Sequence, residues 1–348
     1  MSKKKEFGQF FTTKYTYILQ NCYIPNNVKN IIEPFTGNGD LLNFIKNRDN
    51  YNIECYDIDP KHDYIKKQDT LLNPPNYDNK FIITNPPYLA RNKSKDKSIF
   101  DHYKTNDLYK AFILSLIQSG CNGGIIIVPL NFISSIRTND INLRKQFLEK
   151  FEIEMINIFE KKVFDDTSYT VCTIQFKNQS DVKKYDFKCF VYPRLIKYTF
   201  SLNKTNNFII GGEIYNLKET SSYEIQRATK HNIDEEKYVT NILLKCIDNN
   251  KKKQINLSII DDEQIEQYID NTPNLSVRSY AVLVIKPELS LNEQQILAKR
   301  FNEYLQNYRE KFNSLFLTNY RDSNTIARKR ISFKLAFKII HYLLYNGQ

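Results

Sequence analysis

Short apolar runs alternate with segments of helical spacing along the first half of this 348-residue chain. The runs that predict strands are 30–34, 53–58, 81–84, 124–129 and 171–176. Residues 124–129 are continuously apolar, as in a strand buried on both faces, whereas 171–176 alternates like a half-buried strand. Helical spacing marks 40–45 and 108–119. Strands separated by helices predict an α/β fold with a doubly wound, mostly parallel sheet.

The pattern changes after about Asn178. Polar stretches lengthen, Lys251–Lys253 predicts an exposed loop, and the spacing of apolar residues over 291–344 is largely helical. The length of the chain is comfortable for two domains. We therefore expect an α/β domain over residues 1–178 and a largely helical domain over 179–348.

The chain is basic, with 50 Lys and Arg against 39 Asp and Glu and a net charge of +11. Such a charge favours polyanionic partners, nucleic acid first, although many basic proteins bind none. Segment 301–348 has three acids against eight basic residues, which are Arg309, Lys311, Arg321, Arg328, Lys329, Arg330, Lys334 and Lys338. The run Arg328-Lys329-Arg330 is either a solvated helix face or a surface that contacts phosphates.

The six cysteines contain no C-x-x-C pair, and no histidine stands at ligand spacing from them. This pattern argues against a zinc site and against a disulfide framework, and it favours a reducing compartment. The basic start, Ser2 to Lys5, is not followed by the apolar segment of a signal peptide. The longest apolar runs are far too short to span a membrane. We expect a soluble, cytoplasmic protein without a metal.

A glycine turn, Thr36-Gly37-Asn38-Gly39, stands between the first expected strand and a helix. Glycine lets the backbone approach a ligand closely at such a turn. Asp57 ends the next strand, 18 residues past Gly39, where a carboxylate accepts both hydroxyls of a ribose. Ile58 would flank the adenine ring, and Asp69 would accept the adenine amine. Taken alone Asp57 is an ordinary turn residue, but together with the glycines it predicts a site for an adenosine-containing cofactor.

Asn85-Pro86-Pro87-Tyr88 directly follows the apolar run 81–84. The exocyclic amine of adenine is a poor nucleophile because its lone pair is delocalised into the ring. The Asn85 side-chain oxygen and the Pro86 carbonyl would accept its two hydrogens and localise that lone pair. An already activated methyl donor then needs only positioning and electrostatics, without a metal. Pro87 stiffens the turn, and Tyr88 offers a ring that stacks on a base.

The same tripeptide occurs a second time, in Asn73-Pro74-Pro75-Asn76. No aromatic residue follows it, and no strand precedes it. We therefore interpret residues 73–76 as an ordinary loop, which shows that the strand and the tyrosine around Asn85 carry the inference.

With these motifs in this order, residues 6–178 resemble the gamma-class N6-adenine DNA methyltransferases of restriction–modification systems. The resemblance implies S-adenosylmethionine as the cofactor and a Rossmann-like sheet of seven strands. It adds Glu33, Phe35 and Thr36 to the cofactor site, since 33–40 matches the glycine motif of the family, although Thr36 replaces a small alanine-like residue. Residues 8–13 match an N-terminal segment that closes this site, with Phe11 and Thr12 as contacts. Thr13 stands where the family commonly has proline.

The resemblance extends to later motifs at 108–112, 124–129 and 163–171. The last of these supplies an aromatic residue that packs on the extruded base, Phe164 by its spacing or Tyr169 as the alternative. Core packing is the other explanation of either ring. The target adenine would be flipped out of the duplex and stacked on Tyr88 and Phe164. The basic loop after the N-P-P-Y motif, with Arg91, Lys93 and Lys95, would contact the neighbouring phosphates.

The resemblance makes residues 1–178 a catalytic domain and 179–348 a target-recognition domain for double-stranded DNA. Arg328, Lys329 and Arg330 are the candidate phosphate contacts of the second domain. A cognate endonuclease would be a separate polypeptide. Methylation of adenine in RNA, methylation of a protein glutamine and a DNA-binding module without activity are the alternatives. The presence of both Asp57 and Asn85 disfavours the last of these.

Overall fold

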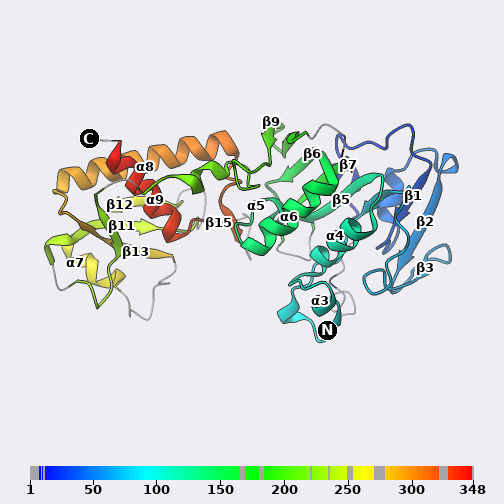
Figure 1. The fold of residues 1–348 in the computed structure, drawn as a ribbon, viewed down its shortest axis with the longest axis horizontal. Helices are drawn as coiled ribbons and strands as arrows, with labels where there is room; N and C mark the ends of the chain where they lie inside the picture. The colour runs from blue at the N-terminus through cyan, green and yellow to red at the C-terminus, as the bar shows by residue number, and fades with distance from the viewer. Residues whose placement is uncertain are drawn as a thin grey trace. The chain divides into compact units, whose positions relative to one another are not determined.

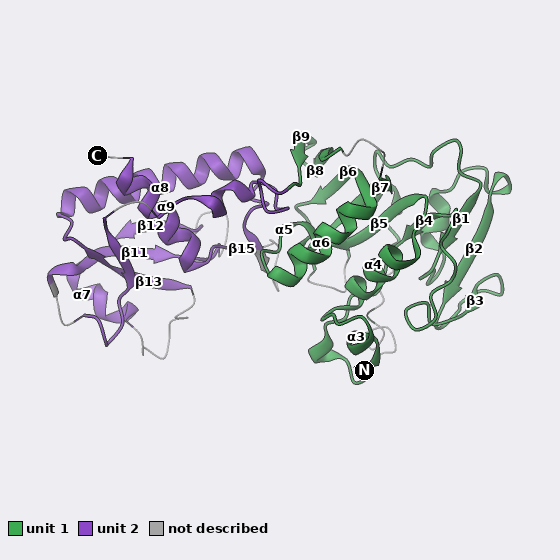
Figure 2. Ribbon diagram, viewed as in Figure 1, with its two compact units in different colours: residues 1–203, 321–327 green, residues 204–320, 328–348 purple. Residues whose placement is uncertain are grey.

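The computed structural model describes residues 8, 10, 12–164, 169–179, 184–219, 222–233, 236–248, 254–269, 279–320 and 328–346. These residues form two compact units, one within 1–203 and one within 204–320 and 328–348 (Figure 2). The division after Asn203 lies later than the expected one after Asn178. The strands 186–192 and 196–201, which lie between these two points, belong to the sheet of the first unit and not to the second domain.

The first unit contains helices and strands in alternation (Figure 1). Their bounds are α2 Tyr15–Ile18, β1 Asn30–Glu33, β2 Asn52–Asp57, β3 Lys66–Lys67, β4 Phe81–Thr84, α3 Ser98–His102, α4 Leu108–Ser119, β5 Gly123–Pro129, α5 Asn131–Ser134, α6 Thr138–Lys150, β6 Phe151–Phe159, β7 Val171–Asn178, β8 Asp186–Tyr192 and β9 Ile196–Ser201. Three short 3-10 helices are η1 Asp40–Phe44, η2 Arg48–Asn50 and η3 Arg91–Lys93. The expected helix after the glycine turn is thus the 3-10 helix η1.

The strands of this unit form one sheet in the order β3-β2-β1-β4-β5-β7-β6-β8-β9. Strands β1 to β5 are parallel to one another, whereas β7 runs antiparallel to both β5 and β6. The expected count of seven strands is wrong, because the described sheet has nine. The additional pair is β8, which runs parallel to β6, and β9, which folds back antiparallel on β8.

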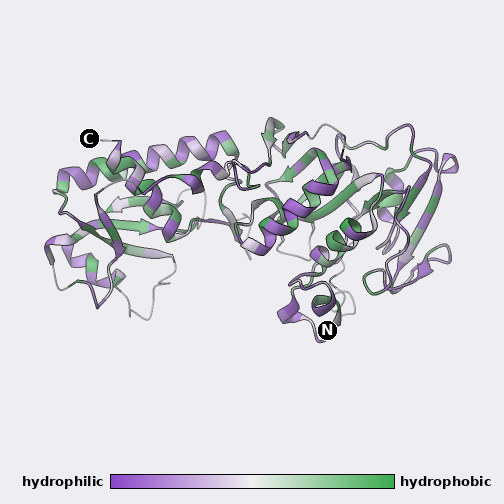
Figure 3. Cartoon of the chain, in the orientation of Figure 1, coloured by the Kyte–Doolittle hydropathy of each residue, from purple (hydrophilic) through white to green (hydrophobic). Residues whose placement is uncertain are grey.

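The central strands of this sheet are buried on both faces. All seven residues of β5 are buried, as its continuous apolar run predicts. The expectation that 171–176 is half-buried is wrong, because these residues of β7 are all buried between β5 and β6. Helices α4 and α6 lie side by side on one face of the sheet (Figure 1), and hydrophobic residues predominate on the central strands (Figure 3).

The direction in which the sheet grows reverses at β1. The chain first moves outward from β1 through β2 to β3, and then returns to place β4 on the other side of β1. In open parallel sheets, the two connections that leave in opposite directions open a crevice at the carboxyl ends of the strands. Here this position is the carboxyl end of β1 and β4.

The second unit combines a sheet with helices. Its elements are η4 Gly212–Asn216, β10 Glu224–Arg227, η5 Glu236–Tyr238, β11 Val239–Lys245, β12 Asn256–Ile259, α7 Asp262–Ile265, η6 Glu266–Tyr268, β13 Tyr280–Lys286, α8 Leu291–Phe312, β14 Thr318–Tyr320, β15 Arg328–Arg330 and α9 Phe333–Tyr345. Four strands form an antiparallel sheet in the order β10-β13-β11-β12. The expected helices α8 and α9 are present, but "largely helical" is wrong for this unit, because the apolar runs 242–244 and 281–285 lie in strands β11 and β13.

The core of the second unit lies between this sheet and its two longest described helices. Phe301 and Leu305 of α8 and Ile339 of α9 pack in one buried cluster with Leu244 and Ile285 of the strands. Hydrophilic residues cover much of the rest of α8 (Figure 3). No helix in the described part of the chain is long and apolar enough to cross a membrane.

Candidate active site

A cavity of about 750 Å³, its open mouth included, lies beside the carboxyl ends of β1, β2 and β4. The predicted site residues that line it are Thr12, Glu33, Phe35, Thr36, Gly37, Asp57, Ile58, Asp69, Asn85 and Pro87. The structure thus brings together residues that are up to 75 positions apart, such as Asn85 and the carbonyl of Phe10. Phe11 lies outside the described residues, and Gly39 stands in the turn without lining the cavity.

The turn after β1 depends on two glycines. Gly37 and Gly39 have φ values of 55° and 80°, in the left-handed region that favours glycine. A Cβ atom on Gly39 would lie 2.5 Å from the hydroxyl of Tyr64. The N–H of Gly39 donates to the carbonyl of Thr36 at 2.8 Å and closes the turn. The sequence spacing therefore reflects a real conformational requirement at this turn.

Asp57 joins the glycine turn to the end of β2. Its Oδ2 accepts the backbone N–H of Gly37 at 2.8 Å, and its Oδ1 accepts the N–H of Asp59 at 2.9 Å. The side chain is buried at the wall of the cavity. These two bonds fix the plane of the carboxylate at the wall of the cavity.

Glu33 and Asp40 place further negative charge on the cavity wall. Glu33 Oε2 and Asp40 Oδ2 are buried, and neither atom has a hydrogen-bond partner in the described part of the chain. Burial, together with the charges of Asp40 and Asp57, raises the pKa of Glu33 well above its ordinary value, although Arg48 opposes this shift. Buried carboxylate oxygens without partners are costly unless a ligand pairs with them. A ligand with a positive charge fits this wall of the cavity.

Asp69 and Thr70 hold the opposite part of the wall. Asp69 Oδ1 accepts the N–H groups of Leu71 and Leu72 at 3.0 and 3.2 Å, which places the side chain at the head of a turn. The Thr70 hydroxyl donates to the carbonyl of Pro34 at 2.9 Å and ties this turn to the end of β1. Asp69 is thereby held with one oxygen engaged, in a position to accept a donor from the ligand.

Asn85 follows β4 directly and is nearly buried, with 8% of its surface exposed. Its Nδ2 donates to the carbonyl of Phe10 at 2.7 Å and to the hydroxyl of Thr12 at 3.1 Å. The Tyr88 hydroxyl contacts Asn85 Oδ1 and lies 2.8 Å from the carbonyl of Ile127. These contacts fix which face of the amide carries the oxygen.

Four aromatic rings lie together beside Asn85. Phe10 stacks on Tyr88, with ring centroids 5.4 Å apart and planes inclined by 29°. Phe10 also contacts Phe164 at 6.2 Å and Tyr169 at 6.5 Å, and Tyr169 meets Tyr88 edge-on at 5.6 Å. Of the two candidates for the last aromatic, Tyr169 contacts Tyr88 directly, whereas Phe164 contacts Phe10, which stacks on Tyr88. Tyr88 is only 2% exposed, so its ring is covered in this conformation.

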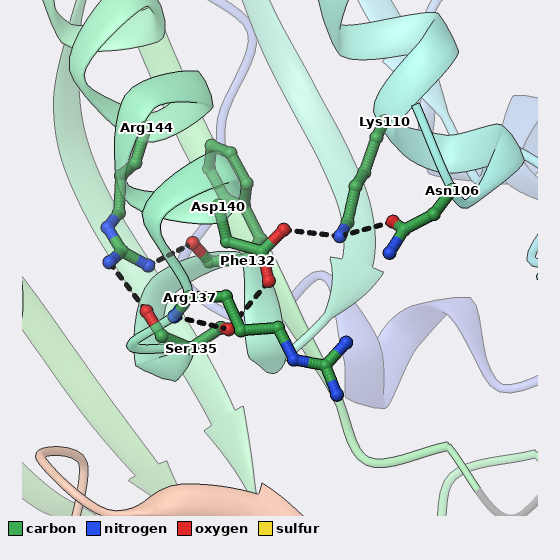
Figure 4. Close-up of polar contacts among 7 residues, drawn as sticks. All are labelled: Asn106, Lys110, Phe132, Ser135, Arg137, Asp140 and Arg144. Atoms are coloured by element: carbon green, nitrogen blue, oxygen red, sulfur yellow. Dashed lines mark hydrogen bonds and ion pairs between the residues drawn. The ribbon is translucent and has the colours of Figure 1, made fainter. Parts of the chain in front are cut away.

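A buried polar network anchors α4, which follows the N-P-P-Y loop (Figure 4). Lys110 Nζ pairs with Asp140 Oδ1 and donates to Asn106 Oδ1 at 2.8 Å. The Ser135 hydroxyl donates to the other oxygen of Asp140 at 2.6 Å. Arg144, which is fully buried, donates to the carbonyl of Ser135 at 2.9 Å. The network connects α4, α6 and the end of α5, and so supports the wall of the cavity at Leu108.

The basic loop after the N-P-P-Y motif is exposed in the first unit. Arg91, Lys93 and Lys95 are all exposed, and Arg91 pairs with Asp101 at 2.8 Å. The loop starts and ends at one place, because the Leu108 N–H donates to the Leu89 carbonyl at 3.2 Å. Its charges therefore stay close to the N-P-P-Y segment.

The basic run 328–330 of the second unit is not on a helix, as one interpretation of the sequence had it, but forms strand β15. Lys329 pairs with Asn319 in the β14–β15 hairpin, and its carbonyl accepts the N–H of Asp248 at 3.0 Å. The side chains of Lys329 and Arg330 are half-buried, and that of Arg328 lies outside the description. Arg309 is internal too, since its Nη2 donates to both oxygens of buried Asp248 at 2.8 and 2.9 Å.

Sequence reasoning missed several residues of the cavity. These are Phe10, Asp40, Leu41, Gln68, Thr70, Leu71, Ile99 and Leu108. Asp40 directly follows the glycine turn, so its position after β1 was a usable signal. Gln68 and Thr70 flank Asp69, but β3 before them has only two residues, Lys66–Lys67, and gave no apolar run. Asn73, which begins the other Asn-Pro-Pro tripeptide, is exposed and does not line the cavity.

Comparison with known proteins identifies a family. The family described as N-6 DNA Methylase matches residues 49–252, more than half of the chain. The Type II methyltransferase M.HincII of Haemophilus influenzae is 31% identical over 193 residues. That match covers 50% of this chain and 38% of the relative, so the chain spans about two fifths of that protein's length.

Solved structures are more distant. The methyltransferase subunit of a type I restriction–modification system from Streptococcus thermophilus is 15% identical, with a TM-score of 0.39, over 57% of this chain and 49% of that one. The M protein of the type I restriction enzyme EcoKI is 13% identical, with a TM-score of 0.40, over 88% of this chain and 72% of that one.

Proposed function

Because the chain belongs to the N-6 DNA Methylase family, we propose that it methylates the exocyclic N6 amine of an adenine in a specific double-stranded DNA site. The methyl donor is S-adenosylmethionine, and the target adenine is flipped out of the duplex. Methylation protects the site from a cognate endonuclease, which is a separate polypeptide. The single observation that carries the proposal is the position of Asn85, after β4 and at the wall of the cavity.

The cavity fits the proposed cofactor. S-adenosylmethionine, when bound, supplies a methyl group activated by a positively charged sulfur. Glu33 and Asp40 have buried oxygens that find no hydrogen-bond partner among the described residues, and these oxygens match its cationic groups. Asp57 would accept the ribose hydroxyls, Asp69 the adenine amine, and Ile58, the wall residue after Asp57, would lie against the adenine ring. Thr12, Phe35, Thr36 and Gly37 complete the wall.

Asn85 and Pro86 would act on the target amine. The Asn85 oxygen and the Pro86 carbonyl accept the two amine hydrogens, which localises the nitrogen lone pair. Asn85 Nδ2 is already held by Phe10 and Thr12, which fixes the direction of its oxygen. One lone pair of this oxygen faces the Tyr88 hydroxyl in the free protein, and the target amine would bind the other. Preorganised acceptors at the site where charge develops are a large source of rate enhancement, and no metal is required.

Aromatic stacking would hold the extruded base. Flipping an adenine out of a duplex costs a few kcal/mol of lost stacking and pairing. Stacking on an aromatic side chain returns about 1–3 kcal/mol for each base. Tyr88 and Phe164 are the proposed rings, and Tyr169 is close enough to Tyr88 to share this role.

DNA contacts are proposed for both units. The exposed side chains of Arg91, Lys93 and Lys95 lie on the loop that leaves the N-P-P-Y segment, where they would hold phosphates beside the flipped base. The second unit, with Arg328 to Arg330 on β15, would read the target site.

Sequencing of DNA that distinguishes N6-methyladenine tests the proposal. Cells without adenine methylation should gain N6-methyladenine at one recurring short site when they express the chain. Asn85→Ala should abolish this signal while the purified variant still binds S-adenosylmethionine in calorimetry. Methylation of RNA with unmodified DNA would assign the enzyme to the other nucleic acid. Wild-type turnover by Asn85→Ala would remove the proposed mechanism.

Asn73→Ala is the matched control, because Asn73 belongs to the same tripeptide in an exposed loop. Its activity should stay close to that of the parent. If Asn73→Ala were inactive and Asn85→Ala active, the first tripeptide and not the second would be the catalytic one.

A further inference from the structure

Phe10 lies against both rings that are proposed to hold the target base. Its ring stacks on Tyr88, with centroids 5.4 Å apart, and contacts Phe164 at 6.2 Å. Tyr169 completes the contact from the side at 6.5 Å. The planes of Phe10 and Tyr88 are inclined by only 29°, which is the arrangement that a base stacked on Tyr88 would adopt.

The main chain of Phe10 also contacts Asn85, the residue that is proposed to bind the target amine. Its carbonyl accepts a hydrogen bond from Asn85 Nδ2 at 2.7 Å, within the residue that would bind the target amine. Two residues earlier, the Gly8 carbonyl accepts the Tyr88 N–H at 3.0 Å. A Cβ atom on Gly8 would lie 2.8 Å from the Tyr88 carbonyl, so the two backbones are in close contact. Phe10 is thus held on the N-P-P-Y segment by its main chain as well as by its ring.

From this arrangement we infer that Phe10 is a placeholder for the flipped adenine. In the free protein its ring covers Tyr88 in place of the base, and the base enters by displacing it. The inference rests on the proposed function, and it adds a residue that competes with the substrate. An aromatic ring suits this role because an empty aromatic slot would leave apolar surface in contact with water.

The placeholder has a physical consequence for base flipping. Entry of the adenine exchanges the contacts of Phe10 with Tyr88 and Phe164 for those of the base. Part of the stacking free energy of the base is therefore spent on releasing Phe10. A smaller side chain at position 10 should make extrusion of the base more favourable, whereas the loss of a ring that supports the base would make it less favourable.

A tryptophan at position 10 reports the displacement directly, because the chain contains no other tryptophan. Phe10 is half-buried, so in the free Phe10→Trp protein the indole should emit at shorter wavelength and be quenched less by iodide than a fully exposed indole. The probe is the duplex that carries the site found by sequencing, added with S-adenosylhomocysteine so that no turnover occurs. The emission should shift to longer wavelength, and quenching should increase at least threefold, as the indole enters solvent. Short-wavelength, protected emission that persists in the complex would overturn the inference.

Two controls test whether the change in emission comes from entry of the target adenine. The same duplex without the adenine site should leave the emission of Trp at position 10 unchanged. Tyr23→Trp, at an exposed position, should report non-specific effects of DNA on an indole in the first unit. If the parent methylates no DNA site at all, the proposed function fails. If the parent methylates the site and the emission and quenching of the indole do not change, only the placeholder fails.

A second measurement introduces no tryptophan and follows the fluorescence of the target base instead. A duplex with 2-aminopurine in place of the target adenine fluoresces more strongly when that base leaves the stack. Phe10→Ala should raise the extruded fraction relative to the parent, by about fivefold in the equilibrium constant for the loss of one aromatic pair. An equal or lower fraction in Phe10→Ala would show that Phe10 supports the base or has no part in its entry. This outcome would also overturn the inference.

Discussion

The carboxylate of Asp57 accepts the backbone N–H of Gly37 at 2.8 Å, so the end of β2 and the turn after β1 form one unit. The other oxygen of Asp57 accepts the N–H of Asp59. Asp57 therefore shapes the turn as well as the cavity. Its proposed role towards the ribose and its structural role have to be separated by the choice of substitution.

We predict that Asp57→Asn weakens the binding of S-adenosylmethionine by about 1.5–3 kcal/mol, the range for a hydrogen bond to a charged group. This corresponds to about a tenfold to hundredfold rise in Kd. Asparagine keeps an oxygen that can accept the Gly37 N–H, but it loses the charge. Calorimetric titration measures the affinity, and thermal unfolding shows whether the turn survives. Asp59→Asn is the matched control, because its carboxylate pairs with Lys61 outside the cavity. Unchanged affinity in Asp57→Asn would exclude Asp57 from the ribose site.

We also predict that cofactor affinity depends on pH through Glu33. Burial and the charges of Asp40 and Asp57 raise its pKa in the free protein, so Glu33 holds its proton above the pH at which an exposed glutamate loses it. A cationic ligand favours the ionised form and lowers this pKa. Binding therefore releases a proton, and affinity rises with pH until the pKa of the free protein is passed. Titrations in buffers of different ionisation enthalpy measure the released proton.

Glu33→Gln should remove this proton release and flatten the dependence of affinity on pH. Glu33→Gln should also change how the stability of the folded protein depends on pH. A raised pKa in the folded state gives Glu33 a stabilising contribution below its unfolded pKa, which is lost as pH rises through the folded value. The parent should therefore lose stability over that window relative to Glu33→Gln. If Glu33→Gln still released a proton on binding, that proton would come from another group.

Local signals were sufficient to predict the architecture around the site. The run 108–119 coincides with α4, and 81–84 with β4, because continuous apolar runs and helical spacing decide these elements locally. The glycine turn and Asp57 were predictable for a similar reason, since positive φ values and an acid at a strand end leave a mark in the sequence. Asn85 was separable from Asn73 only through the strand before it and the tyrosine after it.

The remaining features depend on contacts that are distant in the sequence. Residues 171–176 were expected to be half-buried, but β5 and β6 cover both edges of β7 and all six side chains are buried. The runs 242–244 and 281–285 are apolar, yet their pairing as β11 and β13 joins segments about 40 residues apart. The contact of Phe10 with Tyr88 likewise exists only after the chain has folded.

The buried pair of Lys110 and Asp140 gives a prediction about stability. Lys110→Met should lower the free energy of unfolding of the parent by about 3–5 kcal/mol, because Asp140 keeps its charge and loses its cation in a buried site. Chemical denaturation measures the change. Lys145→Met is the control, since the exposed pair of Lys145 and Glu149, 3.9 Å apart, should contribute less than about 1 kcal/mol. Adding Asp140→Asn to Lys110→Met should restore part of the loss. A loss equal to that of the control would show that the pair does not hold α4.

The last prediction separates the contributions of the two units to DNA binding. Lys93→Gln with Lys95→Gln should weaken binding to any duplex and reduce the slope of log affinity against log salt by about 0.9 for each phosphate contact that is lost. Lys188→Gln with Lys197→Gln, exposed lysines of β8 and β9, is the control and should leave the slope unchanged.

Neutralising Arg328, Lys329 and Arg330 tests the second unit by the same salt titration. If β15 contacts phosphates, the slope should fall by up to about three times the single-contact value, and binding to all sequences should weaken alike. Because Lys329 and Arg330 are half-buried, the experiment has to separate a role in packing from a role in phosphate binding. Side chains that serve only the packing of β15 would lower thermal stability and leave the salt slope of the folded protein at its parent value. That pattern would assign DNA recognition in this unit to other residues, whereas a reduced slope at unchanged stability would place the phosphates on β15.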